Sequence, residues 1–253
     1  MLYGGHVRNL DDIEFLRDYH FDFGEVILDG PDSRVYWGDM YAPRVNGREF
    51  HLIAHGPREG DPNSLDNLLK NYCPSLEATI DTTVRIGANF LTAHLWMDPR
   101  FVSAKLLQEK KSAFERLFAY AHERKVILSL ENLSESAADI EFTLSNIPRG
   151  SITLDIGHGQ LLTTTNRAFD IIERLASKVR HVHIHDNSGG NGVKDDLHLP
   201  VGDGIIDFEG IIRSLLSSGY DNTMTLELKP HELDVSRKKL NQIVDYVRAD
   251  LVA

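Results

Sequence analysis

Histidines alternate along the short segment HVHIHDN at residues 181–187. Because successive side chains of a β-strand point to opposite faces, His181, His183 and His185 would share one face of a strand. Three imidazoles on one face form either a hydrogen-bonded polar interior or part of a metal site. The partners that the rest of the chain supplies decide between these two interpretations.

Polar side chains also stand at the ends of other apolar runs of the chain. Glu131 and Glu227 lie within the apolar runs LSLEN and TLELK, and a buried carboxylate requires a cation or a hydrogen-bond partner. Lysine or arginine would give structural ion pairs, but the neighbouring run ends carry histidine and aspartate instead. A convergent set of Glu, Asp and His without matching Arg favours a divalent metal site over buried ion pairs. The residues at these ends are His55, His94, Glu131, Asp155, His183 or His185, and Glu227.

Two further candidates lie in loops. His158 follows Asp155 by three residues in DIGHG, and Asp196 and His198 stand two apart in DDLHLPVGDGIIDF. A D-x-H pair on an extended loop can reach one metal ion. The alternative for this pair is an ordinary solvated polar loop, and the loop alone does not decide between the two.

The elements that must position these residues alternate along the chain. Eight near-continuous apolar runs are typical of strands covered on both faces, as in parallel sheets. These runs are 1–5, 24–29, 50–55, 89–94, 126–132, 151–157, 180–186 and 223–228. Amphipathic helix patterns lie between them at 10–19, 76–88, 103–125, 167–177, 207–219 and 236–249. We expect Asp207 and Ser236 to be N-caps and Gly219 to be a C-cap.

Eight strand–helix units in 253 residues predict an α/β fold, a (β/α)8 TIM barrel in a single domain over 1–253. A doubly wound open sheet is the alternative, although no GxGxxG follows the first run. The active site of such a barrel lies at the carboxyl ends of its strands, where the polar residues stand. Segment 30–49 breaks the helix pattern and predicts a long loop over the barrel mouth with a short helical turn.

The composition excludes several classes of protein. Cys73 is the one cysteine, so no internal disulfide forms, which indicates a reducing, cytoplasmic location. No apolar run approaches the roughly 20 residues that span a membrane, and the N-terminus turns polar too early for a signal peptide. A net charge of −11 argues against a polyanion partner.

The motifs occur in an order that is found in one known superfamily. LEN at 130–132, LDIGHG at 154–159, HIHDN at 183–187, DLHLPVGDGIIDF at 196–208 and LEL at 226–228 follow one another. With these motifs the chain resembles the xylose-isomerase-like TIM-barrel superfamily, which joins sugar and sugar-phosphate isomerases and epimerases to endonuclease IV. The resemblance implies an enzyme. It also implies self-association as a homo-oligomer, although no sequence feature locates an interface.

The ketose epimerases of this superfamily imply one divalent metal ion, Mn, Zn, Co or Mg, held by Glu131, Asp155, His183 and Glu227. Glu131 and Glu227 would then be the catalytic base and acid that epimerise or isomerise a sugar, sugar phosphate or related polyol. The substrate-binding candidates are His158, His185 and Lys194, the last with backbone amides of NSGGNGVK as a phosphate cradle. The chain departs from these epimerases at Ala137, where they carry Glu, and at Gly189, where they carry Arg.

Endonuclease IV implies a different activity, zinc-dependent phosphodiester cleavage at abasic sites in DNA. Its template adds ligands for up to three metal ions. These additional ligands are His55, His94, His158, Asp196 and His198. Loop side chains would then stack on bases and contact phosphates, namely Arg34, Tyr36, Trp37, Arg44 and Arg58. The acidic net charge favours the isomerase or epimerase over this alternative.

Overall fold

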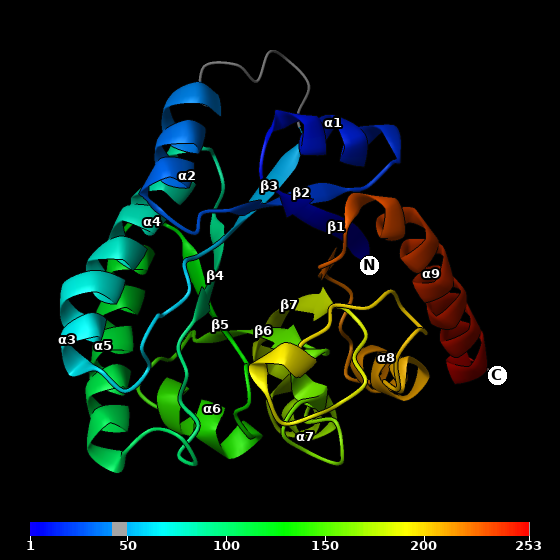
Figure 1. Cartoon of the computed structure of the whole chain (residues 1–253). Helices are drawn as coiled ribbons and strands as arrows, with labels where there is room; N and C mark the ends of the chain where they lie inside the picture. The colour runs from blue at the N-terminus through cyan, green and yellow to red at the C-terminus, as the bar shows by residue number, and fades with distance from the viewer. Residues whose placement is uncertain (42–49, 253) are drawn as a thin grey trace.

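Eight parallel strands form the centre of the molecule. The structure, a computed structural model, describes residues 1–41 and 50–252. The strands close into a barrel in chain order, and β8 pairs with β1 (Figure 1). This closed order confirms the predicted (β/α)8 barrel and excludes the open sheet. The strands are β1 (Leu2–Val7), β2 (Phe23–Ile27), β3 (His51–His55), β4 (Phe90–His94), β5 (Ile127–Glu131), β6 (Ser151–Asp155), β7 (Val179–Ile184) and β8 (Thr223–Leu226).

Helices surround the barrel on its outside (Figure 1). The α-helices are α1 (Leu10–Asp18), α2 (Pro31–Val35), α3 (Leu65–Asn67), α4 (Cys73–Arg85), α5 (Ala104–Glu123), α6 (Ala137–Leu144), α7 (Ala168–Leu175), α8 (Phe208–Ser217) and α9 (Pro230–Val252). Short π-helical segments, Tyr36–Tyr41 and Leu68–Tyr72, extend α2 and join α3 to α4. Among the described residues, no helix combines the length and apolar character needed to cross a bilayer.

The predicted loop over 30–49 is wrong for its first part. Pro31 occupies the first turn of α2, where its missing N–H costs nothing, and the backbone N–H of Gly30 donates to Ser33 Oγ at 3.1 Å. The helical conformation then continues to Tyr41, with the side chain of Trp37 fully buried in the core. Residues 42–49 lie outside the described part of the chain.

The last helix begins six residues before the predicted cap at Ser236. Pro230 starts α9, and Glu232 accepts a hydrogen bond from the backbone N–H of Lys229 at 3.1 Å. Ser236 is buried instead, and its Oγ accepts from the N–H of Val201 at 3.3 Å. The hydroxyl therefore ties α9 to the loop after β7 and is no N-cap.

The other two predicted caps are confirmed. The Asp207 side chain accepts from the N–H of Gly210 at 2.9 Å and starts α8. Gly219 follows the end of α8 with φ +84°, a conformation that glycine adopts without strain. Helix α6 was not among the predicted helices, although Ser136 caps it through the N–H of Asp139.

The barrel interior is layered. Phe23, Ile53 and Phe90 form a small buried apolar cluster inside it, which we call the lower plug. A Cβ atom at Gly4 would lie 2.4 Å from the Phe23 ring, so glycine there makes room for the plug. Hydroxyls fill the next layer, where Thr153 Oγ1 lies 3.1 Å from Thr92 Oγ1 and donates to a serine of β5. The interior thus becomes more polar toward the carboxyl ends of the strands.

Candidate metal centre

Four predicted metal ligands meet at the carboxyl ends of β5, β6, β7 and β8. His183 Nδ1 lies 3.1 Å from Glu227 Oε1, 3.3 Å from Glu131 Oε1 and 3.7 Å from Asp155 Oδ2. All four side chains are buried. We call Glu131, Asp155, His183 and Glu227 the central cluster.

The donor atoms of the central cluster approach one another without hydrogen bonding. Both carboxylate oxygens of Glu131, Oε1 of Glu227 and Nδ1 of His183 are buried and lack a hydrogen-bond partner among the described residues. Three buried carboxylates crowd around one imidazole nitrogen, and such a concentration of negative charge away from water requires nearby positive charge. A carboxylate-rich set with one imidazole suits a divalent cation, and ligand atoms of Glu131, Asp155 and His183 lie within 4.8 Å of one another. The residues present therefore fit such an ion.

Electrostatic coupling within the cluster shifts its pKa values in opposite directions. Burial alone would raise the pKa of Glu131, but the charges of His94 and His183 hold that pKa well below its usual value. The pKa of Glu227 is likewise well lowered, because His183 and His6 outweigh the effect of burial. Burial would lower the pKa of His183, yet its carboxylate neighbours raise it well above normal. The carboxylates are therefore held ionised.

Glu25 on β2 fixes the orientation of the His183 ring. His183 Nε2 lies 3.2 Å from Glu25 Oε1, and His181 Nε2 lies 3.2 Å from Glu25 Oε2. A carboxylate behind a ligating imidazole sets its tautomer and aims the other nitrogen. Glu25 was not predicted as a site residue, although a carboxylate inside the apolar run GEVILD carried the same signal as Glu131.

The three histidines of HVHIHDN therefore have different surroundings. His181 belongs to the polar barrel interior, where its Nδ1 lies 2.8 Å from Thr223 Oγ1 and its Nε2 3.0 Å from Thr225 Oγ1. His183 lies in the central cluster. His185 lies nearer the loop, with Nε2 3.1 Å from Asp155 Oδ1. The polar-interior interpretation therefore describes His181, whereas for His183, among the carboxylates of the central cluster, the metal-site interpretation stays a prediction.

A second group of donors lies beside the central cluster. His94 Nε2 is 2.6 Å and His55 Nε2 is 3.5 Å from Glu131 Oε2. The backbone carbonyl of Gly56 lies 3.0 Å from His55 Nδ1, and the Tyr72 hydroxyl donates to the carbonyl of His94. Glu131 is therefore shared between the central cluster and this pair of histidines from β3 and β4.

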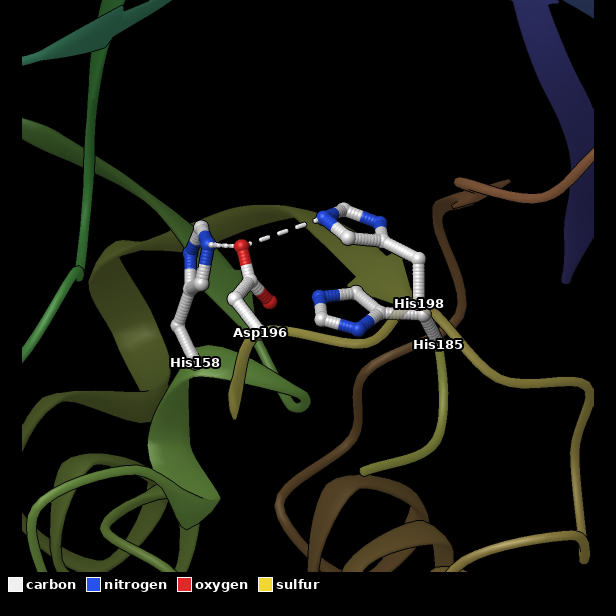
Figure 2. Close-up of side chains that lie close together, drawn as sticks. All are labelled: His158, His185, Asp196 and His198. Atoms are coloured by element: carbon white, nitrogen blue, oxygen red, sulfur yellow. Dashed lines mark hydrogen bonds and ion pairs between the residues drawn. The ribbon is translucent and has the colours of Figure 1, made fainter. Parts of the chain in front are cut away.

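A third group, which we call the outer cluster, contains His158, His185, Asp196 and His198 (Figure 2). Asp196 Oδ2 lies 3.4 Å from His158 Nε2 and 3.2 Å from His198 Nε2, so the aspartate lies between the two rings. The rings of His185 and His198 stack at 3.9 Å between centroids. A Cβ atom at Gly157 would lie 2.0 Å from the His185 ring, so this position of the ring requires glycine.

The outer cluster also shows strain and strong pairing. His198 has φ +47°, which L-residues rarely adopt, and such strain is often stored at functional sites. Burial would lower the pKa of His198, but Asp196 and Glu227 raise it to about 9. His158 joins the outer and central clusters, because its Nδ1 lies 3.2 Å from both Glu131 Oε1 and Asp155 Oδ2.

Loop anchors hold the strand ends that carry these donors. Asn132 bridges β5 and β6, accepting from the N–H of Asp155 and donating to its carbonyl, both at 2.9 Å. Buried Glu59 accepts from the N–H of Trp96 at 2.9 Å and pairs with buried Lys110 at 2.6 Å. These anchors were not predicted, because the sequence does not show that the Asn132 amide and the Glu59 carboxylate accept hydrogen bonds from backbone N–H groups.

Lys194 lies in the loop after β7, two residues before Asp196 of the outer cluster. Lys194 is exposed in a short turn, Val193–Asp195. The N–H groups of Asn191 and Gly192 already donate to Asp195 Oδ2 at 2.9 and 2.8 Å. The expected phosphate cradle is therefore wrong for these two amides, since a carboxylate of the same loop occupies them.

The side chains expected to contact DNA are also placed differently. Trp37 is fully buried and cannot stack on a base. Arg34 donates to Ser75 Oγ at 3.0 Å on α4, and Arg58 is exposed. Arg44 lies outside the described residues. Tyr36 is half-buried and packs edge-on against Trp37, with 5.2 Å between the ring centroids.

Comparisons with known proteins agree with this fold. Fructoselysine 3-epimerase of Escherichia coli O157:H7 is 22% identical over 218 residues, which cover 83% of this chain and 74% of the epimerase. The crystal structure of a D-tagatose 3-epimerase-like protein has a TM-score of 0.82 at 22% identity, covering 99% of this chain and all of the other. The structure of the IOLI protein with a bound zinc atom has a TM-score of 0.75 at 14% identity, covering 100% of this chain and 98% of that one. The family model described as xylose isomerase-like TIM barrel matches residues 13–249, and the chain belongs to this family.

Proposed function

We propose that this chain is a divalent-metal-dependent isomerase or epimerase that acts on a ketose or a related polyhydroxy substrate. The observation that carries the proposal is the approach of Glu131 and Glu227, from β5 and from the end of β8, to one point, His183 Nδ1. Two carboxylates around one point can serve both faces of one substrate carbon. The similarity to proteins named as sugar epimerases supports the same class of reaction.

Glu131, Asp155, His183 and Glu227 would hold the metal ion. A divalent ion bound there would polarise the substrate carbonyl and stabilise negative charge on its oxygen. The zinc atom in the structure of the IOLI protein is consistent with zinc as one candidate, beside Mn, Co and Mg.

Glu131 and Glu227 would exchange the proton of the reacting carbon. Their lowered pKa values keep both carboxylates ionised at neutral pH, so either can accept that proton. The glutamate that accepts the proton becomes protonated and can return that proton to the substrate. Delivery to the opposite face requires the other glutamate to have first taken up a proton from water. His158 and His185 border this point and would hold substrate hydroxyls.

The substrate class is a sugar or polyol that needs neither the Glu nor the Arg of the ketose epimerases. Ala137 is buried at the start of α6 and offers no functional group. Gly189 has φ +73°, which disfavours a side chain there. The substrate contacts that those two side chains would make must therefore come from other residues or be absent.

A phosphodiesterase like endonuclease IV is the second candidate. One observation favours it: all nine residues that match its ligand pattern lie in three connected groups at the barrel mouth. Such a site would hold two or three metal ions, and clustered ions activate water for attack on phosphate.

Metal content and substrate assays on the same preparation test both candidates. Elemental analysis of protein purified without chelator gives the ions per chain. Solvent proton exchange in heavy water against a panel of ketoses, sugar phosphates and inositols detects the isomerase, and a duplex with an abasic site detects the nuclease. We expect about one ion per chain and exchange on at least one carbohydrate, without cleavage of DNA. About three zinc ions with cleavage of the duplex would overturn the proposal.

His198→Ala separates the two candidates further. His198 belongs to the outer cluster and not to the central cluster. If the protein is a one-metal isomerase, the substitution should leave most of its proton-exchange activity. If it is a three-metal nuclease, the substitution should abolish cleavage of the abasic-site duplex. The matched control is His231→Ala, since His231 is exposed on α9.

A further inference from the structure

A cavity of about 720 Å³ lies at the opposite end of the barrel, where the strands begin. Its walls come from the starts of β3 to β8 and from the connections that precede them. The lower plug separates it from the metal centre, since Ile53 and Phe90 form its floor and are buried. The cavity is therefore a separate compartment from the mouth.

Three cationic side chains border this cavity. Arg149 comes from the connection before β6, and Lys178 and Arg180 come from the start of β7. Among the described residues, no ion pair or hydrogen bond neutralises any of the three. No Asp or Glu occurs among the described residues that line the cavity.

This arrangement differs from the rest of the surface. The chain carries 38 acidic and 27 basic residues. Because acidic residues are in excess, a group of basic side chains without acidic partners is not expected from the composition. Elsewhere Arg213 pairs with Asp250 and with Glu209, and Arg248 pairs with Asp221 at 3.0 Å. Three like charges around one cavity repel one another unless an anion binds between them.

The other lining groups complement an organic anion. Phe90 and half-buried Phe118 give an apolar wall. Asn89, Ser177 and Asn222 add polar groups whose side chains make no hydrogen bond within the described structure. A cavity of this volume is within the range of sites for small organic molecules, which combine apolar walls with a few polar groups.

We propose that this cavity binds a small phosphorylated organic molecule at the amino-terminal end of the barrel. The guanidinium groups of Arg149 and Arg180 would grip the phosphate, because their planar donors match phosphate oxygens better than an ammonium group does. The organic part would lie on Phe90 and Phe118. This site is independent of the proposed reaction at the mouth.

Calorimetric titration of the full chain tests the proposal with three probes: inorganic phosphate, fructose 6-phosphate and adenosine monophosphate. We expect one site per chain that takes at least one of the phosphate esters more tightly than inorganic phosphate and weakens as salt rises. The ester that binds more tightly identifies whether a sugar or a base occupies the apolar wall.

Variants locate the binding site. The double variant Arg149→Ala/Arg180→Ala should lower the affinity for the ester by at least about tenfold, since two charge-assisted contacts are lost. Lys105→Ala removes an exposed positive charge far from the cavity. It should change the affinity less than twofold, because salt screens the interaction with a distant surface charge. His198→Ala, at the mouth, should also leave the affinity unchanged.

Folding of the double variant is checked by circular dichroism, and Lys178→Gln gives an independent variant at the same cavity. Absence of binding by all three probes, or equal affinity in wild type and both cavity variants, would overturn the proposal. Loss of affinity in His198→Ala would assign the binding to the mouth instead. Sedimentation as a dimer that the double variant converts to a monomer would identify this face as a contact between copies and would also overturn it.

Discussion

The two ends of this barrel concentrate charges of opposite sign. At the mouth, carboxylates crowd around His183, and within the described part of the chain the oxygens of Glu131 and Oε1 of Glu227 lack a hydrogen-bond partner. At the other end, cations border a cavity whose described lining has no carboxylate. Between them lie the lower plug and a layer of hydroxyls that bond to one another. The barrel therefore has charged side chains at both ends, and apolar or hydrogen-bonded side chains between the two ends.

The comparison teaches where stability and function reside along each strand. Side chains alternate along each strand, so a residue of the lower plug and a donor of the candidate metal centre stand on one inward face, as Phe90 and His94 do on β4. Substitutions low in the barrel should change the free energy of unfolding, whereas those at the mouth should change turnover or metal binding.

Glu227→Gln should have the largest effect on turnover. Loss of one of two acid–base groups lowers turnover by about 10²–10⁴-fold, because glutamine cannot take up the substrate proton. Proton exchange in heavy water on the active substrate measures the loss, and circular dichroism shows that the fold remains. The control is Glu173→Gln, an exposed glutamate on α7. Wild-type exchange in Glu227→Gln would remove this residue from the catalytic pair.

Phe90→Ala should lower the stability of the fold and leave turnover unchanged. Truncating a buried aromatic side chain of the lower plug costs about 3–5 kcal/mol in the free energy of unfolding. Turnover of the folded fraction should be kept, because Phe90 lies below the hydroxyl layer. Urea unfolding measures the change, with Tyr246→Ala as a control because Tyr246 is exposed on α9. A large loss of turnover in the folded protein would contradict the separation of the two regions.

The barrel was predictable from the sequence because strands covered on both faces read as continuous apolar runs. The donors at the strand ends were predictable as well, since a carboxylate such as Glu131 within an apolar run needs a partner. Their meeting in one place follows from the barrel itself, which brings the carboxyl ends of all strands to one edge.

The rest depended on contacts distant in sequence. Glu25 carried the signal of a carboxylate in an apolar run, but its partner could not be read from the sequence, because only the closed barrel brings it to His181 on β7, 156 positions away. The start of α9 did carry a local signal, Pro230 with Glu232, but the hydroxyl of Ser236 suggested a later cap. The cationic cavity had no sequence signal, since Arg149 lies in a connection and Arg180 in β7, and only the fold brings them to one cavity.

Glu25→Gln tests how the barrel interior supports the mouth, because it should lower the affinity of the central cluster for metal. The amide would no longer accept from both His181 and His183, so His183 Nδ1 would be aimed less well. Losing such a partner lowers metal affinity by about 10–100-fold. Competition between metal-free protein and a chromophoric chelator measures the affinity without any substrate. The control is Glu14→Gln, exposed on α1. Equal affinity in Glu25→Gln and wild type would show that Glu25 is only a structural partner.

Asp98→Asn should have the smallest effect, at the rim of the mouth. Buried Asp98 accepts from Arg100 Nε at 3.0 Å and from Ser134 Oγ at 2.8 Å, and it joins the loops after β4 and β5. Burial would raise the pKa of Asp98, but these hydrogen bonds hold that pKa below its usual value. A carboxylate with a lowered folded-state pKa stabilises the fold above its unfolded pKa, near 4, and loses that contribution as pH falls. The variant should therefore be less stable than wild type by about 1–2 kcal/mol at neutral pH, and the difference should shrink below about pH 4. Urea unfolding from neutral pH to about pH 3 measures both limbs, with the exposed Asp29→Asn as a control. A difference that stays constant across this range would show that the charge of Asp98 does not stabilise the rim.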